Sequence, residues 1–458
     1  MRPVALRAVA LAAAAAALAL PAAAQNLGSL YDAARGFDAT YQAARAQAEA
    51  TTARGAQARA GILPQVGVAA SASRTDSEIR TPAGTGPRDF STTQVGVQAT
   101  QALYRPANWA AYRQGQRQAE LALAQLQLAE QDLIVRVGQA YFDLLAADDN
   151  LRLIRAQKAA VAEQRDTAQR NFDLGNATVT DQREAQARYD LVVAQEIAAD
   201  NDRQVRQVAL DQLVGRTGAR PWAPADAQLP PPAAPADLGA WLAQAEDAHP
   251  AIAQARIGLD LARLETDKAR AGHLPTVDAT LSYGVNRNPQ GTLTTTTRTT
   301  VDAAQAGVQL NLPLFAGFAV QNRVRETLAL EDQAAAQLDG ARRSVAQATR
   351  TAWLGLASGR SRVSALAAAE ASSRSALEAT QLGYQVGVRV GLDVLNAQAQ
   401  LYQTERDLAA ARYAVLLGEL RLRQAAGTLD AEALRPIDAL LAPPVLEAGA
   451  AATPGLAR

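Results

Sequence analysis

Few residues in this 458-residue chain have the types and spacing that catalysis or metal binding requires. The chain has no cysteine, which excludes disulfides, thiolate metal sites and cysteine nucleophiles. Its two histidines, His249 and His273, are too few for a histidine-based metal or proton-transfer site. A serine lies between Gly355 and Gly359, but its spacing does not fit a nucleophile elbow, and no phosphate-binding loop occurs. We therefore expect no enzyme activity, no catalytic residue, no metal site and no cofactor.

The remaining candidate residues are polar side chains beside two glycines that interrupt stretches otherwise suited to helix. Thr180 and Asp181 lie close to Gly175. Tyr384, Arg389, Asp393 and Asn396 lie close to Gly387. Taken alone, such residues are typical of solvated charges in turns. What they can do depends on the elements that carry them.

Those elements occur twice, because the sequence repeats itself. The stretch Ala58–Pro64 returns as Ala269–Pro275, 211 positions later, and Val95–Tyr104 returns as Ala306–Phe315 at the same offset. Two copies of one long unit can supply repeated structural elements to a closed, symmetric wall. The predicted organisation comprises a signal peptide (1–24), a first repeat (25–218), a linker rich in Pro and Ala (219–237), a second repeat (238–428) and a partly disordered tail, also rich in Pro and Ala (429–458).

Each repeat contains a long stretch without proline, from Ala107 to Arg220 and from Leu314 to Arg435. Because proline breaks helix interiors, each stretch can form a helix of roughly 65 to 70 residues. Glycine favours the left-handed backbone that ends helices, so Gly175 and Gly387 predict a turn and a return helix of roughly 35 to 40 residues. Apolar or small residues recur every seven positions, which indicates a coiled-coil seam, although an ordinary two-stranded coiled coil has the same spacing.

Ahead of each long helix, alternating residues predict a β-hairpin. The strands begin near Val66 and Val95 in the first repeat and near Val277 and Val308 in the second. The polar connections, 75–90 and 286–300, suit long external loops, and strands of roughly 10 to 14 residues can cross a bilayer when tilted. Four strands cannot close a barrel, so the chain must oligomerise if the hairpins lie in a membrane: two chains would give eight strands and three would give twelve.

Helical segments are also predicted before each hairpin, over 27–59 and 238–270. His249-Pro250 aligns with Asp38-Ala39, and both pairs are expected at a helix start. Arg2, Arg7, an apolar run and a small-residue cleavage site at Ala24 predict an export signal. The formal net charge of 0 argues against a nucleic-acid surface.

This order of elements, with the motifs at the two glycine turns, resembles the TolC-type family of outer-membrane efflux proteins. The motifs begin at Phe172 and Tyr384, and the resemblance covers about Asn26 to Thr428. It implies an α+β membrane protein: a homotrimer in which a periplasmic α-helical coiled-coil barrel joins a twelve-stranded transmembrane β-barrel. It also implies a cell outer-membrane location, a periplasmic adaptor, and an inner-membrane pump or ABC exporter that supplies the energy for efflux or type I secretion.

The resemblance assigns roles at the periplasmic tip. Tyr384 and Arg389 would tie to Thr180 and Asp181 and hold the tunnel shut. Asp393 would form an anionic ring at the constriction. The family pattern has a second acid three residues later, whereas this chain has Asn396, and a single acidic ring should bind multivalent cations more weakly than a double one.

A second interpretation is a periplasmic coiled-coil scaffold or stalk without a pore. It would account for the heptads and the export signal. It does not account for strand pairs at the same place in both repeats.

Overall fold

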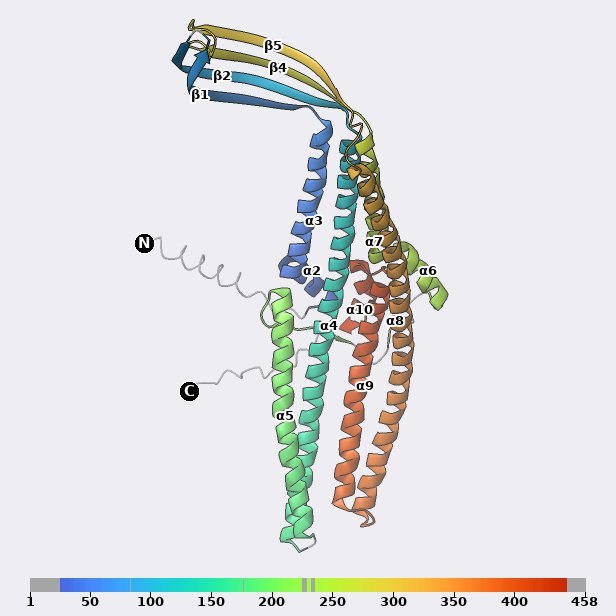
Figure 1. The fold of residues 1–458 in the computed structure, drawn as a ribbon. Coiled ribbons are helices and arrows are strands. Elements are labelled where there is room, and N and C mark those ends of the chain that lie inside the picture. The colour runs from blue at the N-terminus through green and yellow to red at the C-terminus, as the bar shows by residue number, and fades with distance from the viewer. Residues whose placement is uncertain (1–24, 83, 176, 225–228, 232–234, 443–458) are drawn as a thin grey trace, which may run out of the picture. The chain divides into compact units, whose positions relative to one another are not determined.

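The computed structural model describes residues 25–442, apart from 83, 176, 225–228 and 232–234 (Figure 1). The predicted signal peptide and the last residues of the predicted tail lie outside the described residues. Contacts divide the chain into two compact units. The first comprises 1–44, 127–250 and 343–458, and the second comprises 45–126 and 251–342. Each unit therefore takes segments from both predicted repeats.

The second unit carries one antiparallel sheet of four strands, which confirms the predicted hairpins. Its strands are β1 (Gln65–Thr81), β2 (Gly84–Tyr104), β4 (Thr276–Asn288) and β5 (Thr299–Asn311). The order in the sheet is β1-β2-β4-β5, so the two hairpins pair through β2 and β4. Strands β1 and β5 are the edges of this sheet.

The predicted loop of the first hairpin is wrong. The strands continue through it, with Thr75 paired to Phe90 and Ser77 to Arg88. Backbone ladder hydrogen bonds do not require apolar side chains, and cross-strand ion pairs such as Arg74 with Asp89 stabilise the polar part of the ladder. The second hairpin has a longer connection, 289–298, close to the predicted one.

Helices of the second unit approach each other closely in the first repeat. Here α3 (Ala39–Gln57) packs against α4 (Pro106–Asp173). A Cβ atom added to Gly115 would lie 2.8 Å from the Cβ of Ala58 and 2.8 Å from the carbonyl oxygen of Gly55. Only a residue without a side chain allows this crossing.

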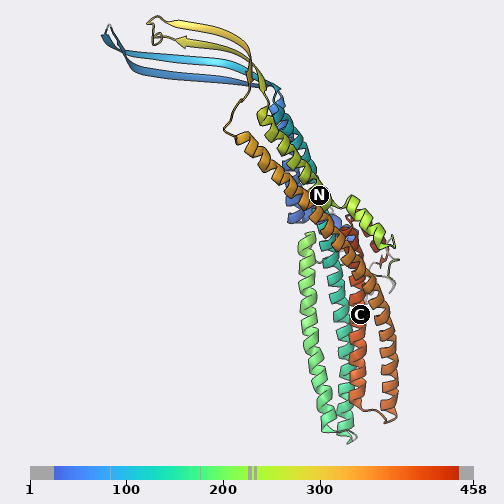
Figure 2. The same ribbon diagram turned by 45° about the vertical axis from the view of Figure 1, so that its right-hand side comes forward.

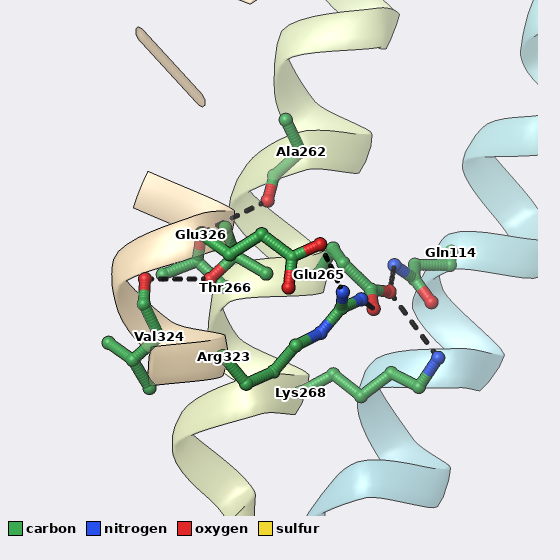
Figure 3. Close-up of polar contacts among 9 residues, drawn as sticks. Gln114, Ala262, Glu265, Thr266, Lys268, Arg323, Val324 and Glu326 are labelled. Carbon is green, nitrogen blue, oxygen red and sulfur yellow. Dashed lines mark hydrogen bonds and ion pairs between the residues drawn. The ribbon is translucent and has the colours of Figure 1, made fainter. Parts of the chain in front are cut away.

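At the offset of 211, Thr266 stands in place of Gly55 and Glu326 in place of Gly115, so the corresponding positions of the second repeat are polar. They lie on α7 (Pro250–Arg270) and α8 (Ala319–Gln385). Figure 3 shows Glu265 accepting hydrogen bonds from Gln114 Nε2 at 2.8 Å and Arg323 Nη2 at 2.6 Å. Beside it, the buried hydroxyl of Thr266 donates to the carbonyl oxygen of Ala262 at 3.2 Å. The two repeats therefore join similar helices by different means.

The first unit contains two antiparallel helix pairs, formed by α4 and α8 beyond residues 126 and 342 and by the helices that return along them. Helix α4 has 68 residues and returns as α5 (Val179–Val214), with 36 residues. Helix α8 has 67 residues and returns as α9 (Gly391–Ala425), with 35 residues. These lengths confirm the prediction made from the proline-free stretches. None of the described helices combines the length and apolarity that crossing a membrane takes.

The four helices of this unit lie side by side in the order α5, α4, α9, α8 (Figure 2). The residues of this unit that are buried at the predicted seven-residue spacing are Leu133, Ala147, Ile154 and Val161 of α4, Val345 of α8, and Val394, Leu401, Leu408, Val415 and Leu422 of α9. One cluster joins three helices and consists of Leu151, Ile154, Val161, Val192, Ala199 and Leu395. Helices α5 and α8 stand at the ends of the row.

Shorter elements of the first unit bring distant parts of the chain together. Helix α10 (Arg435–Asp438) ends at a carboxylate that accepts hydrogen bonds from the backbone N–H groups of Leu27 at 2.8 Å and Gly28 at 3.1 Å. Asp438 thus caps α2 (Leu27–Phe37), a favourable place for a negative charge. Strand β3 (Ala223–Pro224) of the linker pairs with β6 (Leu441–Ala442).

At both predicted helix starts, Asp38-Ala39 and His249-Pro250, a short break separates two helices. Helix α2 ends at Phe37 and α3 begins at Ala39, while α6 (Leu238–Ala248) ends one residue before His249. At the first break, Asp38 accepts a hydrogen bond from the Tyr41 backbone N–H at 2.8 Å. Its carboxylate also accepts two hydrogen bonds from Arg136, both at 2.9 Å. The Arg136 guanidinium holds the pKa of Asp38 below its usual range despite burial.

We predict that Asp38→Asn lowers the free energy of unfolding by about 2 kcal/mol at pH 7, since it breaks a partly buried bidentate pair. A lowered pKa stabilises the folded protein above the unfolded value of about 3.9, and this stabilisation is lost as pH falls through the folded pKa. The difference between variant and wild type should therefore shrink below about pH 4. Thermal unfolding followed from pH 7 to pH 3 measures it.

The matched control is Asp132→Asn. Asp132 contacts the same guanidinium at 2.8 Å, but its side chain is 57% exposed. Its replacement should cost less than about 0.5 kcal/mol. Equal losses for the two variants, or a loss at Asp38 that does not change with pH, would contradict the prediction.

Candidate gate at the two glycine turns

Both glycines adopt the left-handed backbone that the turn prediction requires. Gly175 has φ 78° and Gly387 has φ 76°. Helix α4 ends at Asp173 and α8 ends at Gln385, each two residues earlier. Both sites carry exposed apolar side chains as well as charges.

Asp181 is held by its own turn. Thr178 is the N-cap of α5, and its backbone N–H and hydroxyl donate to the Asp181 carboxylate at 3.0 and 2.8 Å. The Asp181 N–H donates back to the Thr178 hydroxyl at 3.2 Å. This reciprocal capping box fixes the start of the return helix and leaves the carboxylate exposed.

Arg389 lies in the second turn beside Asp393. The closest nitrogen and oxygen atoms are 3.6 Å apart, with side chains 61% and 37% exposed, so this pair is weak. The backbone N–H groups of Val388 and Arg389 donate to the Gly383 carbonyl oxygen at 2.8 and 3.1 Å. A Cβ on Gly383 would lie 2.8 Å from the Arg389 Cγ, so this glycine leaves room for the arginine to fold over the helix end.

A cavity of about 210 Å³ gathers residues from both turns. Its lining includes Asp181, Tyr384 and Arg389, which the sequence analysis had grouped. Asn171 donates a long hydrogen bond of 3.4 Å to the Tyr384 hydroxyl across the two helix pairs. Among the described residues, the lining does not include Thr180.

The expected ties from Tyr384 and Arg389 to Thr180 and Asp181 are not made among the described residues of one chain. In the part of the chain that the structure describes, Asp181 bonds to Thr178 and Arg389 pairs with Asp393. Asp181, Tyr384 and Arg389 nevertheless line one cavity. The arrangement can make and break ion pairs and hydrogen bonds, which is the chemistry of a latch.

The residues predicted to form the constriction lie on the first turns of α9. Asp393 is at its acidic start, and Asn396 accepts a hydrogen bond from Arg188 Nη2 of α5 at 3.0 Å. Arg188 belongs to the first-turn motif but had no predicted role. Its cation beside Asn396 would oppose any cation bound at that position.

Sequence reasoning missed Asn171, Thr178, Gly383 and Arg188 at this site. The Thr-x-x-Asp pattern of a capping box was visible at Thr178. The other three act across elements, which no local pattern indicates. Over the described stretches, no group of three His, Cys, Asp or Glu side chains is placed to hold a metal ion.

Comparisons with known proteins agree with this architecture. A model of the outer membrane efflux protein family matches residues 30–216 and 241–428, well over half of the chain. The chain is 30% identical to the outer membrane protein TolC of Vibrio cholerae, over 91% of this chain and 94% of that protein. It is 32% identical to the alkaline protease secretion protein AprF of Pseudomonas aeruginosa, over 86% and 82%.

A solved structure shares the fold. The outer membrane protein VceC of Vibrio cholerae aligns with a TM-score of 0.74 at 21% identity, over 88% of this chain and 96% of that one. The match to the family model and the identity to TolC along almost the whole length of both chains establish the relationship. The protein belongs to the outer membrane efflux protein family and is an α+β outer-membrane channel protein, an exit duct for efflux or type I secretion.

Proposed function

We propose that this exit duct works as a homotrimer that conducts substrates passively and closes at the two glycine turns. The four-stranded sheet carries this proposal, because β1 and β5 are its two edges. Unpaired edges are not tolerated in lipid. Pairing β1 of one chain with β5 of the next in a ring of three would close a twelve-stranded transmembrane barrel.

The helical row supports the same assembly. Helix α5 stands at one end and exposes five large apolar side chains, which are between 51% and 68% exposed: Val179, Leu191, Ile197, Val205 and Val208. At the other end, Leu354 of α8 is 57% exposed. Contact between α5 of one chain and α8 of the next would cover these residues and close the coiled-coil barrel.

The turns are the proposed gate. In the trimer, Tyr384 and Arg389 would hold Thr180 and Asp181 of the neighbouring turn, and Asp393 would form the anionic ring. Opening would be a shift between closed and open states, biased by a partner that binds the open one. Bilayer recording of a gate variant, described below, tests this proposal.

The partners proposed for this chain follow from the same turns and from the relatives. Leu174, Val388 and Val390 are 74%, 78% and 58% exposed, which suits a docking surface for a periplasmic adaptor. An inner-membrane pump or ABC exporter would supply the energy, since we infer that the chain is a conduit and not an enzyme. The name of AprF, a protease secretion protein, favours type I secretion as one use.

Two measurements test the assembly. Membrane fractionation should require detergent to release the protein, whereas a periplasmic scaffold would wash off. Purified protein in a planar bilayer should conduct, and chemical crosslinking should stop at the trimer. A washable protein without conductance, or a crosslinked ladder that ends at the dimer, would overturn the proposal.

The position of Asn396 predicts weak block by multivalent cations. Asn396→Asp should add a second ring of three acids and lower the concentration of a trivalent cation that halves conductance, by about tenfold. Arg188, which contacts Asn396, would partly neutralise the new ring, so adding Arg188→Ala should strengthen the block further. Gln400→Glu, one turn further along α9, is the control and should change the block less. No change with Asn396→Asp would contradict the constriction assignment.

A further inference from the structure

The junction between β5 and α8 exposes apolar side chains that no core requires. Leu314 is 90% exposed, Phe315 is 76% exposed and Phe318 is 62% exposed. The rings of Phe315 and Phe318 meet edge to face, with centroids 5.5 Å apart. An exposed aromatic pair of this kind marks an interaction surface.

The backbone at this junction is strained. Phe318 has φ 63°, a left-handed conformation that is unfavourable for a bulky residue. Such strain persists where the surrounding structure or a ligand requires it. Here it holds the Phe318 side chain beside a pocket rather than in the chain's own core.

The pocket is basic. Its volume is about 680 Å³, and Arg270 and His273 line it from the end of α7 and the turn that follows. Arg325 lines it from the first turns of α8, and Phe318 lies at its wall. Gln321 and Asn322 add amide groups. All of these residues belong to the second unit.

The two guanidinium groups are available to an anion. Among the residues described, Arg325 has no ion pair or hydrogen bond through its side chain. Arg270 pairs with Asp267 at 3.6 Å, and both side chains are more than half exposed, so that pair is weak. Arginine binds phosphate oxygens in a bidentate manner.

The first repeat lacks this basic pocket. At the offset of 211, Arg59 corresponds to Arg270, but Ile62 stands in place of His273 and Gln114 in place of Arg325. Ala107 stands in place of Phe318. The repeated fold therefore does not require these side chains.

We propose that this junction binds the phosphate head group of an anionic glycerophospholipid. Arg270, His273 and Arg325 would contact the phosphate, while Leu314 and Phe315 would lie against the glycerol and acyl chains. This inference rests on the proposed placement of the strands in the membrane, because strand ends lie where head groups and aromatic side chains meet.

The experiment uses the full chain in detergent and counts bound lipid by native mass spectrometry. Phosphatidylglycerol is titrated against the wild type and against a variant with the first repeat's residues, His273→Ile with Arg325→Gln. The variant should bind phosphatidylglycerol about tenfold more weakly. Arg59→Ala, at the corresponding place of the first repeat, should bind it as the wild type does.

Two further ligands distinguish the sources of phosphate. Phosphatidylcholine is zwitterionic and should bind more weakly than phosphatidylglycerol. Inorganic phosphate should not displace phosphatidylglycerol at equal concentration. Equal binding by wild type and variant, or displacement by inorganic phosphate, would overturn the inference. Detergent release and conductance are measured on the same samples. If the wild type leaves the membrane without detergent and does not conduct, the proposed membrane placement is wrong. If the wild type conducts but the variant binds phosphatidylglycerol as tightly as the wild type does, only the head-group site is wrong.

Discussion

Gly115→Val is expected to open the contact between α3 and α4. Even the Cβ of alanine at this position would lie 2.8 Å from both the Ala58 Cβ and the Gly55 carbonyl oxygen, so the helices must separate. Overpacking of this kind costs about 2 kcal/mol, which corresponds to roughly thirtyfold faster amide hydrogen exchange in α3. Exchange measured by mass spectrometry on peptides from residues 45–57 reads this change directly.

Gly340→Ala is the matched control. Gly340 is also a glycine within a long helix of the same unit, but an added Cβ would meet nothing within 4 Å. It should therefore stabilise α8 by about 0.5–1 kcal/mol, as alanine favours helix over glycine. Gly115→Ala should lie between the two variants. Unchanged exchange in Gly115→Val would show that the close crossing does not hold this part of the molecule together.

Arg389→Ala with Tyr384→Phe is expected to shift the channel toward its open state. Three exposed latches worth about 0.7 kcal/mol each add up to about 2 kcal/mol in a trimer, or roughly thirtyfold in the ratio of open to closed channels. Single-channel recording in planar bilayers should show the open level for a much larger share of the time. The substitutions leave the capping box of Asp181 and Thr178 intact, whereas Asp181→Ala would also destabilise the start of α5.

Two controls sharpen this experiment. Arg183→Ala removes a cation from the first turns of α5 and should leave gating unchanged. Arg389→Lys keeps the charge but loses the bidentate fork, so it should give an intermediate shift. If the wild type and the double variant are open for the same fraction of the time, the two turns do not form the gate.

The long helices were predictable because their signals are local. Three signals suffice to place α4, α5, α8 and α9: a stretch without proline, a seven-residue period, and a glycine in the turn between the two helices of each pair. The strands were placed by alternation, but their ends were not. Alternation stops at Thr75, whereas the ladder of β1 with β2 continues to Thr81 and Gly84, because backbone pairing does not depend on apolar side chains.

The gate was predictable only in part. Tyr384, Arg389 and Asp181 were grouped by a resemblance, and they do line one cavity. The partners within the chain were not foreseen, because Asn171 reaches Tyr384, and Arg188 reaches Asn396, from other helices. Such contacts depend on how helices are rotated about their axes, and a heptad pattern places the buried side of a helix without naming the residues across from it.

The capping of α2 by Asp438 has a consequence for the timing of synthesis. The carboxylate that completes the first helix lies 411 residues after Leu27, near the end of the described chain. A ribosome must add all the residues between α2 and Asp438 before this partner exists, so α2 receives its cap late in synthesis. A polypeptide that must travel through a translocation pore before it folds benefits from this delay, because early residues cannot lock into place while later ones are still being threaded.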